Sequence, residues 1–243
     1  MLTRDKVRGM FLGIAIGDRL GLPMETMTAP KIATKFGRVT TYLSTTHNRF
    51  MENLEVPWSD DTEYSLLVAE SLIANGCIDL DDLAARHIAA LDNNIFGSGK
   101  STIEASKRLK AGIHWSESGK TDNPKLGKGN GVAMKVAPIG AFLSSKKLKM
   151  LSHDIWLSIK KLARLTHDTQ MATASAFVHI GTIIHCLTDR EINRNFAGQV
   201  LLSSADGFPV YRGNGTSEDS LFERFLKLMG VIDIRLFTNQ EII

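Results

Sequence analysis

The chain has 243 residues, of which 43% are hydrophobic and 23% are charged, close to the averages of globular proteins. A chain of this length and composition can bury a core, which excludes an intrinsically disordered protein and a disulfide-stapled miniprotein. The two cysteines, Cys77 and Cys186, form no Cys-x-x-Cys pair, so a zinc ribbon is excluded as well. We expect two buried free thiols in the reducing cytoplasm. No apolar run approaches the roughly 18 residues of a membrane span, and no clear signal peptide opens the chain.

The formal net charge of +3 is unevenly distributed along the chain. Residues 1–99 contain nine basic and thirteen acidic side chains, residues 100–164 fourteen and four, and residues 165–243 six and nine. A basic middle between acidic flanks suggests an anionic ligand that meets a cation held by acids. The aromatic residues Trp115, Phe142 and Trp156 are scattered through the middle segment. This pattern does not favour a nucleic-acid partner, since no nucleic-acid-binding motif accompanies it.

Hydrophobic spacing predicts helices nearly throughout the chain. Apolar residues recur at intervals of three and four from Val7 to Ile14, which places them on one face of a first helix. A helix is expected over about 62–75, ending at Gly76, and another after Asp79, which is suited to cap it. Further helices are expected over about 101–111, 152–165, 168–187, 189–202 and 218–229.

Two long irregular segments are expected at about 29–58 and 113–131. Irregular segments of this length inside a compact domain are usually functional or disordered. No sustained alternation of apolar and polar residues predicts a strand. We therefore expect one all-α domain spanning residues 1–243.

The strongest local motif is Trp-Ser-Asp-Asp-Thr at residues 58–62. The adjacent carboxylates of Asp60 and Asp61 repel each other unless a cation or a helix N-terminus compensates. Oxygen ligands of this kind suit Mg²⁺, Mn²⁺ or Ca²⁺ rather than zinc. Considered alone, the motif favours ordinary helix capping by Ser59 or Asp60, because Ser and Asp lead the N-cap preferences.

Four glycines lie four residues apart along the first expected helix, at positions 9, 13, 17 and 21. Glycine destabilises a helix interior by about 1 kcal/mol relative to alanine, so this stripe predicts the close approach of another helix. Asp18 and Glu25 lie near the end of the helix, where the helix dipole does not favour acids. We expect polar or metal partners there, and the preferred interpretation of Asp18 is a buried, hydrogen-bonded structural acid.

A Lys-Gly-Asn-Gly segment at residues 128–131 precedes an apolar stretch. Backbone N–H groups at such a helix start would form an anion site, with charge added by Lys128 and Lys135, although Asn-Gly is also common in ordinary turns. A Leu-Thr-His tripeptide occupies residues 165–167. A lone histidine is more often structural than catalytic, and Thr166 or Asp168 is suited to cap the next helix.

Residues 97–101, Gly-Ser-Gly-Lys-Ser, are similar to the end of a phosphate-binding P-loop. That motif requires a glycine at position 94, which is Asn94 here, and a buried strand before it. The preceding segment is predicted to be helical. A P-loop NTPase is therefore not favoured.

Taken together and in this order, the four motifs resemble the ADP-ribosylglycohydrolase family. The family's opening helix has the form G-x-x-x-G-D-x-x-G-x-x-x-E, matched from Gly13 to Glu25. Its W-[TS]-D-D-T metal motif is matched at 58–62, its G-N-G-x-x-M-R loop at 129–135 with Lys135 in place of Arg, and its L-T-H motif at 165–167. The resemblance covers about residues 4–187, and on its strength the Asp-Asp motif is interpreted as metal-binding.

The resemblance implies an orthogonal all-α fold with two Mg²⁺ or Mn²⁺ ions in a cleft. It also implies hydrolysis of the bond from ribose C1″ of ADP-ribose to a protein side chain or a related leaving group, since a metal can bind the ribose diol and acidify a water. By the same resemblance Ser59, Asp60 and Asp61 hold metal, and Glu25 and Asp60 are the catalytic acids. The residues implied in binding the substrate are Lys128, Gly129, Asn130, Gly131, Met134 and His167.

Residues 188–243 depart from the family pattern, because the second metal motif, G-G-D-x-D-T, has no match there. We therefore expect a C-terminally shortened domain with diverged residues 188–243, and one ion where the family has two. The expected partner is an ADP-ribosylated protein or another ADP-ribose conjugate, with no membrane. A catalytically impaired ADP-ribose-binding or regulatory protein is the alternative. Loss of the last family helix would expose apolar surface, which predicts homo-oligomerisation.

Overall fold

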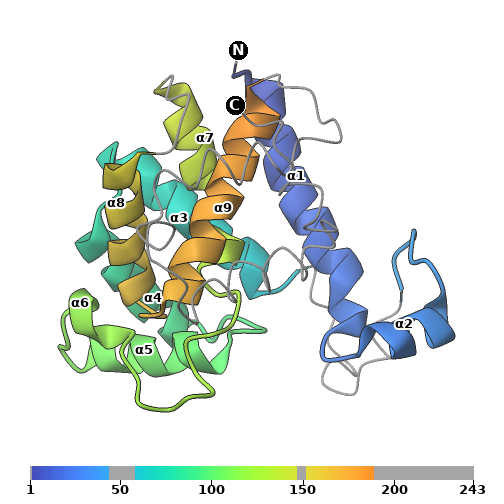
Figure 1. Cartoon of the computed structure of the whole chain (residues 1–243), viewed down its shortest axis with the longest axis horizontal. Coiled ribbons are helices and arrows are strands. Elements are labelled where there is room, and N and C mark those ends of the chain that lie inside the picture. Colours follow the sequence, from blue (N-terminus) through green and yellow to red (C-terminus); the bar gives the residue numbers. More distant parts are fainter. Residues whose placement is uncertain (1, 44–57, 147–151, 189–243) are drawn as a thin grey trace, which may run out of the picture.

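The computed structural model describes residues 2–43, 58–146 and 152–188. These residues form nine α-helices and no strand, which confirms the all-α prediction for this part of the chain (Figure 1). The helices expected at 189–202 and 218–229 lie outside the described residues. The α-helices are α1 Arg4–Gly21, α2 Ala29–Phe36, α3 Asp60–Asn75, α4 Leu80–Asp92, α5 Lys100–Lys110, α6 Trp115–Ser118, α7 Ala137–Ser145, α8 His153–Arg164 and α9 Gln170–Leu187, with 3-10 turns η1 at Leu22–Met24 and η3 at Ala133–Lys135.

Side-chain caps set the starts of several helices. Asp79 accepts hydrogen bonds from the backbone N–H groups of Asp81 and Asp82 at 3.0 and 2.9 Å, as the sequence predicts for α4. Thr169 caps α9 by accepting from Ala172 N at 3.2 Å. The prediction that Thr166 or Asp168 caps this helix was wrong, because α9 begins at Gln170, later than expected, and Thr169 is therefore its N-cap.

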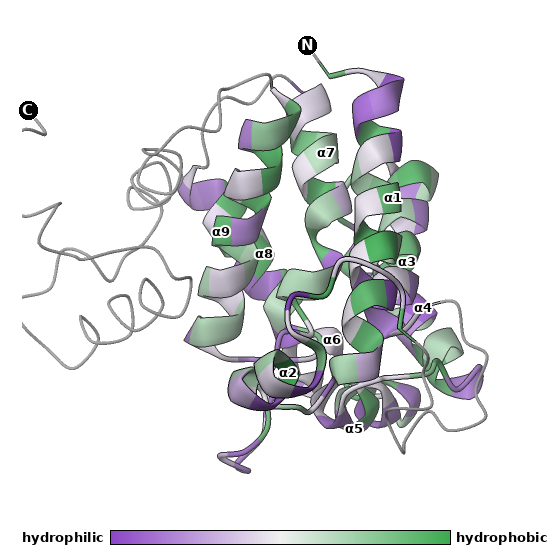
Figure 2. Cartoon of the chain, turned by 90° about the vertical axis from the view of Figure 1, so that its right-hand side faces the viewer, coloured by the Kyte–Doolittle hydropathy of each residue, from purple (hydrophilic) through white to green (hydrophobic). Residues whose placement is uncertain are grey.

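The hydrophobic core lies where α3, α7, α8 and α9 meet. Figure 2 shows α7 between α9 on one side and α1 and α3 on the other. Trp156 of α8 packs edge-on against Phe177 of α9, with ring centroids 5.3 Å apart. Fully buried side chains from all four helices fill this core, among them Val68, Ile139, Ile159, Leu162, Phe177 and Ile180. The core fixes the start of α3 and the turn before α9, which position the site described below.

The central helix α9 is long and apolar enough to cross a membrane by length and composition. The expectation that no segment approaches that length was therefore wrong. In the structure more than half of the helix is buried, because α7, α8 and η3 pack against it. Burial of this kind is what a core helix of a globular domain shows.

Helices α1 and α2 depart most from the expectations. No described residue would lie within 4 Å of a Cβ atom added at Gly9, Gly13, Gly17 or Gly21, so the helix that the glycine stripe predicts is not found among the described residues. The segment expected to be irregular at 29–58 instead begins with α2, which stands apart from the rest of the described structure (Figure 1). Residues 44–57 lie outside the described residues.

The two thiols also differ from expectation. Cys77 and Cys186 are both exposed rather than buried. Cys77 follows the left-handed Gly76 that ends α3, and Cys186 lies on the outer face of α9. Exposure of a side chain at the end of one helix and on the outer face of another could not be inferred from composition.

Candidate functional site

Asp18 joins the end of α1 to the start of α3. Its carboxylate accepts hydrogen bonds from Ser59 N and Ser59 Oγ, both at 2.8 Å, and from Thr62 N and Thr62 Oγ1 at 3.2 and 2.6 Å. Backbone N–H groups at a helix start have no intrahelical partner, so an acceptor there stabilises the helix. The prediction of a hydrogen-bonded structural acid is confirmed, although Asp18 is only half-buried.

Ser59 is the N-cap residue of α3, as one of the two capping alternatives predicts. Its hydroxyl oxygen accepts from Asp61 N at 3.4 Å while donating to Asp18. Capping and ligand binding are compatible here. The cap turns the side chains of Asp60 and Asp61 toward the same end of α3.

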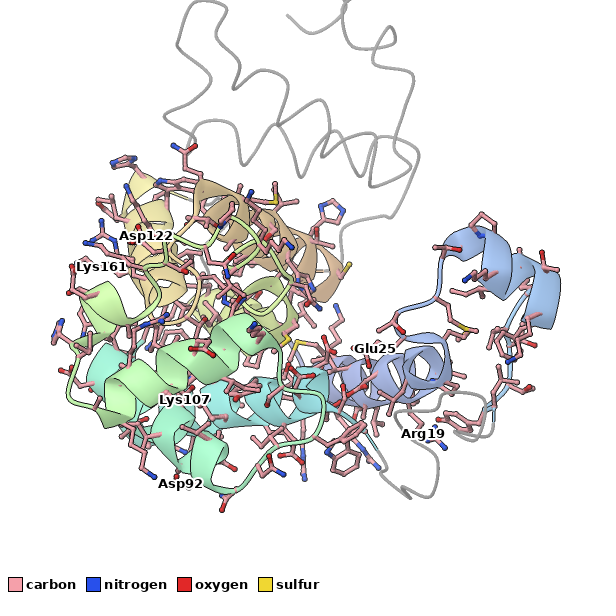
Figure 3. All side chains as sticks on the ribbon, turned by 90° about the horizontal axis from the view of Figure 1, so that it is seen from below. Arg19, Glu25, Asp92, Lys107, Asp122 and Lys161 are labelled. Carbon is pink, nitrogen blue, oxygen red and sulfur yellow. The ribbon has the colours of Figure 1, made fainter. Side chains whose placement is uncertain are left out.

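Three carboxylates, those of Glu25, Asp60 and Asp61, form what we call the acidic cluster. Burial raises the pKa of Asp60 to about 7, and repulsion by Asp61 and Glu25 adds to the shift. Burial also raises the pKa of Asp61, with repulsion from Asp18, and the pKa of Glu25, with repulsion from Asp61 and Asp18. Figure 3 shows Glu25 where α1 meets the helix bundle. The cluster therefore concentrates acidic groups whose ionised forms are disfavoured by burial and by mutual repulsion.

The loop at residues 97–99 packs directly on Asp60, a role that sequence reasoning missed. Gly97 has φ +87°, and a Cβ atom added there would lie 2.8 Å from Asp60 Oδ1 and 3.1 Å from Ser59 Cβ. The backbone N–H of Gly99 donates to the Asp60 carboxylate. The P-loop-like glycines thus allow the backbone to approach an acid, and a helix, α4, precedes them as expected. The positive φ and the contact with a residue almost forty positions earlier leave no signal in the sequence.

The Gly129–Gly131 loop links the acidic cluster to His167. Asn130 Nδ2 donates to Asp61 Oδ1 at 3.3 Å, so the structure brings the two motifs together. A Cβ atom added at Gly131 would lie 2.5 Å from His167 Cε1 and 3.0 Å from His167 Nε2. Only glycine fits at 131 beside the imidazole ring, which explains the second glycine of the motif.

His167 is buried against this loop. Its Nδ1 atom lies 2.9 Å from Thr166 Oγ1, and burial together with the nearby Lys135 lowers the pKa of the imidazole to about 4. His167 is therefore a neutral imidazole at physiological pH. A neutral ring offers one N–H donor and one bare nitrogen acceptor.

Lys135, which the sequence predicts to add charge to an anion site at the loop, is fully buried. Its Nζ atom lies 2.9 Å from His87 Nε2 and 3.3 Å from Thr166 Oγ1. Burial lowers the pKa of Lys135 to about 7, opposed by the charge of Asp60. We call His87, Lys135, Thr166 and His167 the lysine–histidine chain. It ends at the loop whose other side contacts the acidic cluster.

The remaining predicted residues differ in their placement. Lys128, Gly129 and Asn130 are exposed, whereas the Met134 side chain packs partly buried against the core. The loop is followed by the single 3-10 turn η3 rather than by an α-helix. The anion site predicted from a helix N-terminus is therefore not present at this turn, and the loop presents only its own backbone and Lys128.

The motifs agree with what related sequences show. A family model described as ADP-ribosylglycohydrolase matches residues 1–225. The chain belongs to the ADP-ribosylglycohydrolase family. The match includes residues 188–225, which the sequence reasoning had set apart as diverged.

Three curated proteins illustrate the relationship of this ADP-ribosylglycohydrolase family member. It is 32% identical over 137 residues to an uncharacterized protein of Archaeoglobus fulgidus, covering 56% of this chain and 42% of that protein. It is 30% identical over 139 residues to the ADP-ribosyl-[dinitrogen reductase] glycohydrolase of Rhodospirillum rubrum, covering 56% and 44%. It is 26% identical over 165 residues to YegU of Escherichia coli, covering 63% and 47%. The aligned part thus spans less than half the length of each relative.

The acidic cluster of this family member has the donor chemistry of a divalent-cation site. Its carboxylates and the Ser59 hydroxyl supply only oxygen, which Mg²⁺ and Mn²⁺ prefer. Within the described ranges no ion pair joins a Lys or Arg side chain to Asp60 or Asp61, and in the same ranges no three His, Cys, Asp or Glu side chains are arranged to hold a metal by themselves. These residues fit an ion that is bound through one or two carboxylates and keeps several waters, as Mg²⁺ commonly does.

Proposed function

We propose that the chain is a metal-dependent hydrolase that cleaves the C1″ glycosidic bond of an ADP-ribosylated protein or a related ADP-ribose conjugate. Ser59, Asp60 and Asp61 would hold Mg²⁺ or Mn²⁺. Family membership supports hydrolysis of an ADP-ribosyl bond. The observation that carries the metal-dependent form is the largely buried Asp60 carboxylate beside Asp61, because two close acids without a cation are electrostatically unfavourable.

The acids would divide the chemistry according to their surroundings. A divalent ion, when bound, orients the ribose diol and acidifies a water molecule. Glu25 lies at the exposed edge of the cluster, and its raised pKa suits a carboxylate that takes up a proton from water and releases it again. Asp60, held by Gly99 N and packed against Gly97, keeps a fixed orientation toward the reacting end of the substrate.

The loop side would bind the rest of ADP-ribose. The exposed backbone of Gly129 and Asn130, with the charge of Lys128, faces the position of a pyrophosphate, and His167 lies behind the loop. Met134 would contribute through packing, because its backbone N–H closes the loop onto Asn130 O at 2.9 Å. Phosphate binding and bond cleavage would then lie on two sides of one contact, the hydrogen bond from Asn130 to Asp61.

Incubation of the full chain with an ADP-ribosylated protein and Mg²⁺ or Mn²⁺ tests the proposal. We expect release of ADP-ribose, its loss in Asp60→Asn, and its loss on addition of a chelator. Asp92→Asn is the matched control, because Asp92 is an exposed acid paired with Lys110 away from Glu25 (Figure 3). No release by the unmodified chain with any divalent ion would contradict the enzymatic function.

Calorimetry with ADP-ribose distinguishes the alternative, an ADP-ribose-binding or regulatory protein. Binding of ADP-ribose without release from any conjugate would favour that alternative. The same titration with Gly131→Ala should show weaker binding, because the added methyl group displaces His167 or the loop. Unchanged affinity in this variant would remove the loop from the binding site.

A further inference from the structure

The hydrogen bonds of the lysine–histidine chain run in a fixed direction, which a backbone carbonyl group at one end determines. His87 Nδ1 lies 2.8 Å from Leu83 O, and a carbonyl oxygen can only accept, so Nδ1 carries the proton. The neutral His87 ring therefore has a bare Nε2 atom. Burial and the nearby Lys135 keep the pKa of His87 well below its ordinary value, which agrees with a neutral ring. Lys135 Nζ, 2.9 Å away, donates to that nitrogen.

Lys135 also donates a hydrogen bond to Thr166. Its Nζ atom donates to Thr166 Oγ1 at 3.3 Å, because an ammonium group has three N–H groups and no lone pair with which to accept. Thr166 Oγ1 contacts one other polar atom within the described chain, His167 Nδ1 at 2.9 Å. If His167 Nδ1 carried the proton, the buried Thr166 hydroxyl would be left without an acceptor, which is unfavourable for a buried donor.

We propose that Lys135 and Thr166 are positioning residues that hold His167 as the tautomer with its proton on Nε2. The Thr166 hydroxyl donates to Nδ1, and the Nε2–H group is directed to the Gly129–Gly131 loop. That side is defined by geometry, because Nε2 is the atom nearest to a Cβ added at Gly129, at 3.9 Å, and lies 3.0 Å from one added at Gly131. Through this series of hydrogen bonds, the Leu83 carbonyl on α4 determines that His167 presents one N–H donor to the loop.

The Nε2–H group of His167 favours a ligand that presents a hydrogen-bond acceptor at this position. Resting on the proposed function, the Nε2–H group donates to a phosphate or ribose oxygen of ADP-ribose held by the loop. A ring with the opposite tautomer would present a lone pair to that oxygen, and the two would repel. Lys135 and Thr166 would therefore affect substrate binding without touching the substrate.

Nitrogen-15 NMR of the histidine rings in the labelled full chain tests the tautomer without any ligand. Comparison with a His167→Asn spectrum assigns the ring. We expect His167 to be protonated at Nε2 in the unmodified chain and in Thr166→Ser, which keeps the hydroxyl group. In Thr166→Val we expect a substantial Nδ1–H population. The matched control is Thr173→Val, because Thr173 is also buried but its hydroxyl donates to Thr169 O within α9.

Two results would overturn the proposal: a proton on Nδ1 of His167 in the unmodified chain, or an unchanged Nε2 tautomer in a folded Thr166→Val variant. The binding arm uses ADP-ribose itself. Thr166→Val should weaken its affinity roughly tenfold, as expected for one misdirected hydrogen bond, and Thr166→Ser should restore it. If the tautomer is as proposed but ADP-ribose does not bind, the proposed function fails and the positioning role stands. If ADP-ribose binds equally well to both variants, the role in binding fails.

Discussion

The acidic cluster and the lysine–histidine chain are neighbouring polar groups that differ in burial and in the interactions of their members. All four residues of the lysine–histidine chain are buried, whereas the acidic cluster extends from the buried Asp60 to the exposed Glu25. In the lysine–histidine chain a continuous series of hydrogen bonds runs from Leu83 O to His167 Nδ1. In the acidic cluster burial raises the pKa of each carboxylate, and repulsion by Asp61 adds to the shifts of Asp60 and Glu25. A satisfied network fixes architecture, whereas an uncompensated one is a candidate for ligand binding.

Asp18 sharpens this comparison, because it is an acid beside the cluster that does have a full set of partners. Asp18→Ala removes four hydrogen bonds at the start of α3 and should lower the free energy of unfolding by about 4 kcal/mol. Urea unfolding in the presence of a chelator measures it. Asp5→Ala replaces an exposed acid in the first turn of α1, the helix that also carries Asp18. It should lower the free energy of unfolding by less than about 1 kcal/mol. Equal losses in the two variants would show that Asp18 is not the structural acid.

Asp60→Asn should instead raise the free energy of unfolding of the metal-free protein. Because the pKa of Asp60 rises from 3.8 to about 7 on folding, the folded chain binds this proton more tightly, and ionisation of Asp60 destabilises the fold as the pH rises from about 4 to 7. At pH 8 the substitution should therefore stabilise the chain by about 3 kcal/mol, and the gain should vanish near pH 4. Asp92→Asn should show no such pH dependence. A destabilised Asp60→Asn at pH 8 would mean that the protein itself compensates this charge.

For Lys135→Met we expect the opposite pH dependence of the stability difference, and at higher pH. The pKa of Lys135 falls from 10.5 to about 7 on folding, so the unfolded chain holds the proton more tightly, and the unmodified protein gains stability as the pH rises from about 7 toward 10.5. Relative to the Met variant it should gain about 2 kcal/mol between pH 7 and pH 9. Lys161→Met, at an exposed lysine of α8 (Figure 3), is the matched control. A flat difference for Lys135→Met would show that this amine stays charged in the fold.

The smallest expected effect is a difference in stability between alanine substitutions at Gly97 and Gly99, the two glycines of the loop that packs on Asp60. Gly97→Ala introduces a Cβ atom 2.8 Å from Asp60 Oδ1 at a positive φ, and should destabilise the chain by about 1 kcal/mol or slightly more. Gly99→Ala has nothing within 4 Å of the new atom and should destabilise the chain by less, only because alanine is less favourable than glycine at the N-cap of α5. Equal effects of the two substitutions would contradict the close packing of Gly97 on the acid.

The sequence predicted the parts of the site that are local in the chain. Asp60 and Asp61 are adjacent and follow a capping serine, so their convergence at a helix start follows from capping preferences. The burial of Lys135 could not be predicted, because its partners His87 and Thr166 come from other elements and only the packed fold brings them together. The role of Gly97 likewise depends on a contact with α3. The helix predicted to pack on the glycine stripe of α1 is not among the described residues, since spacing along one helix does not say which segment covers it.

Titration calorimetry of Mg²⁺ and Mn²⁺ into the metal-free full chain tests the central claim, that the acidic cluster binds a divalent cation and the lysine–histidine chain does not. We expect saturable binding by the unmodified chain and by Lys135→Met, and its loss in the Asp60→Asn, Asp61→Asn double variant. Absence of saturable binding by the unmodified chain, or equal binding by the double variant, would contradict the account.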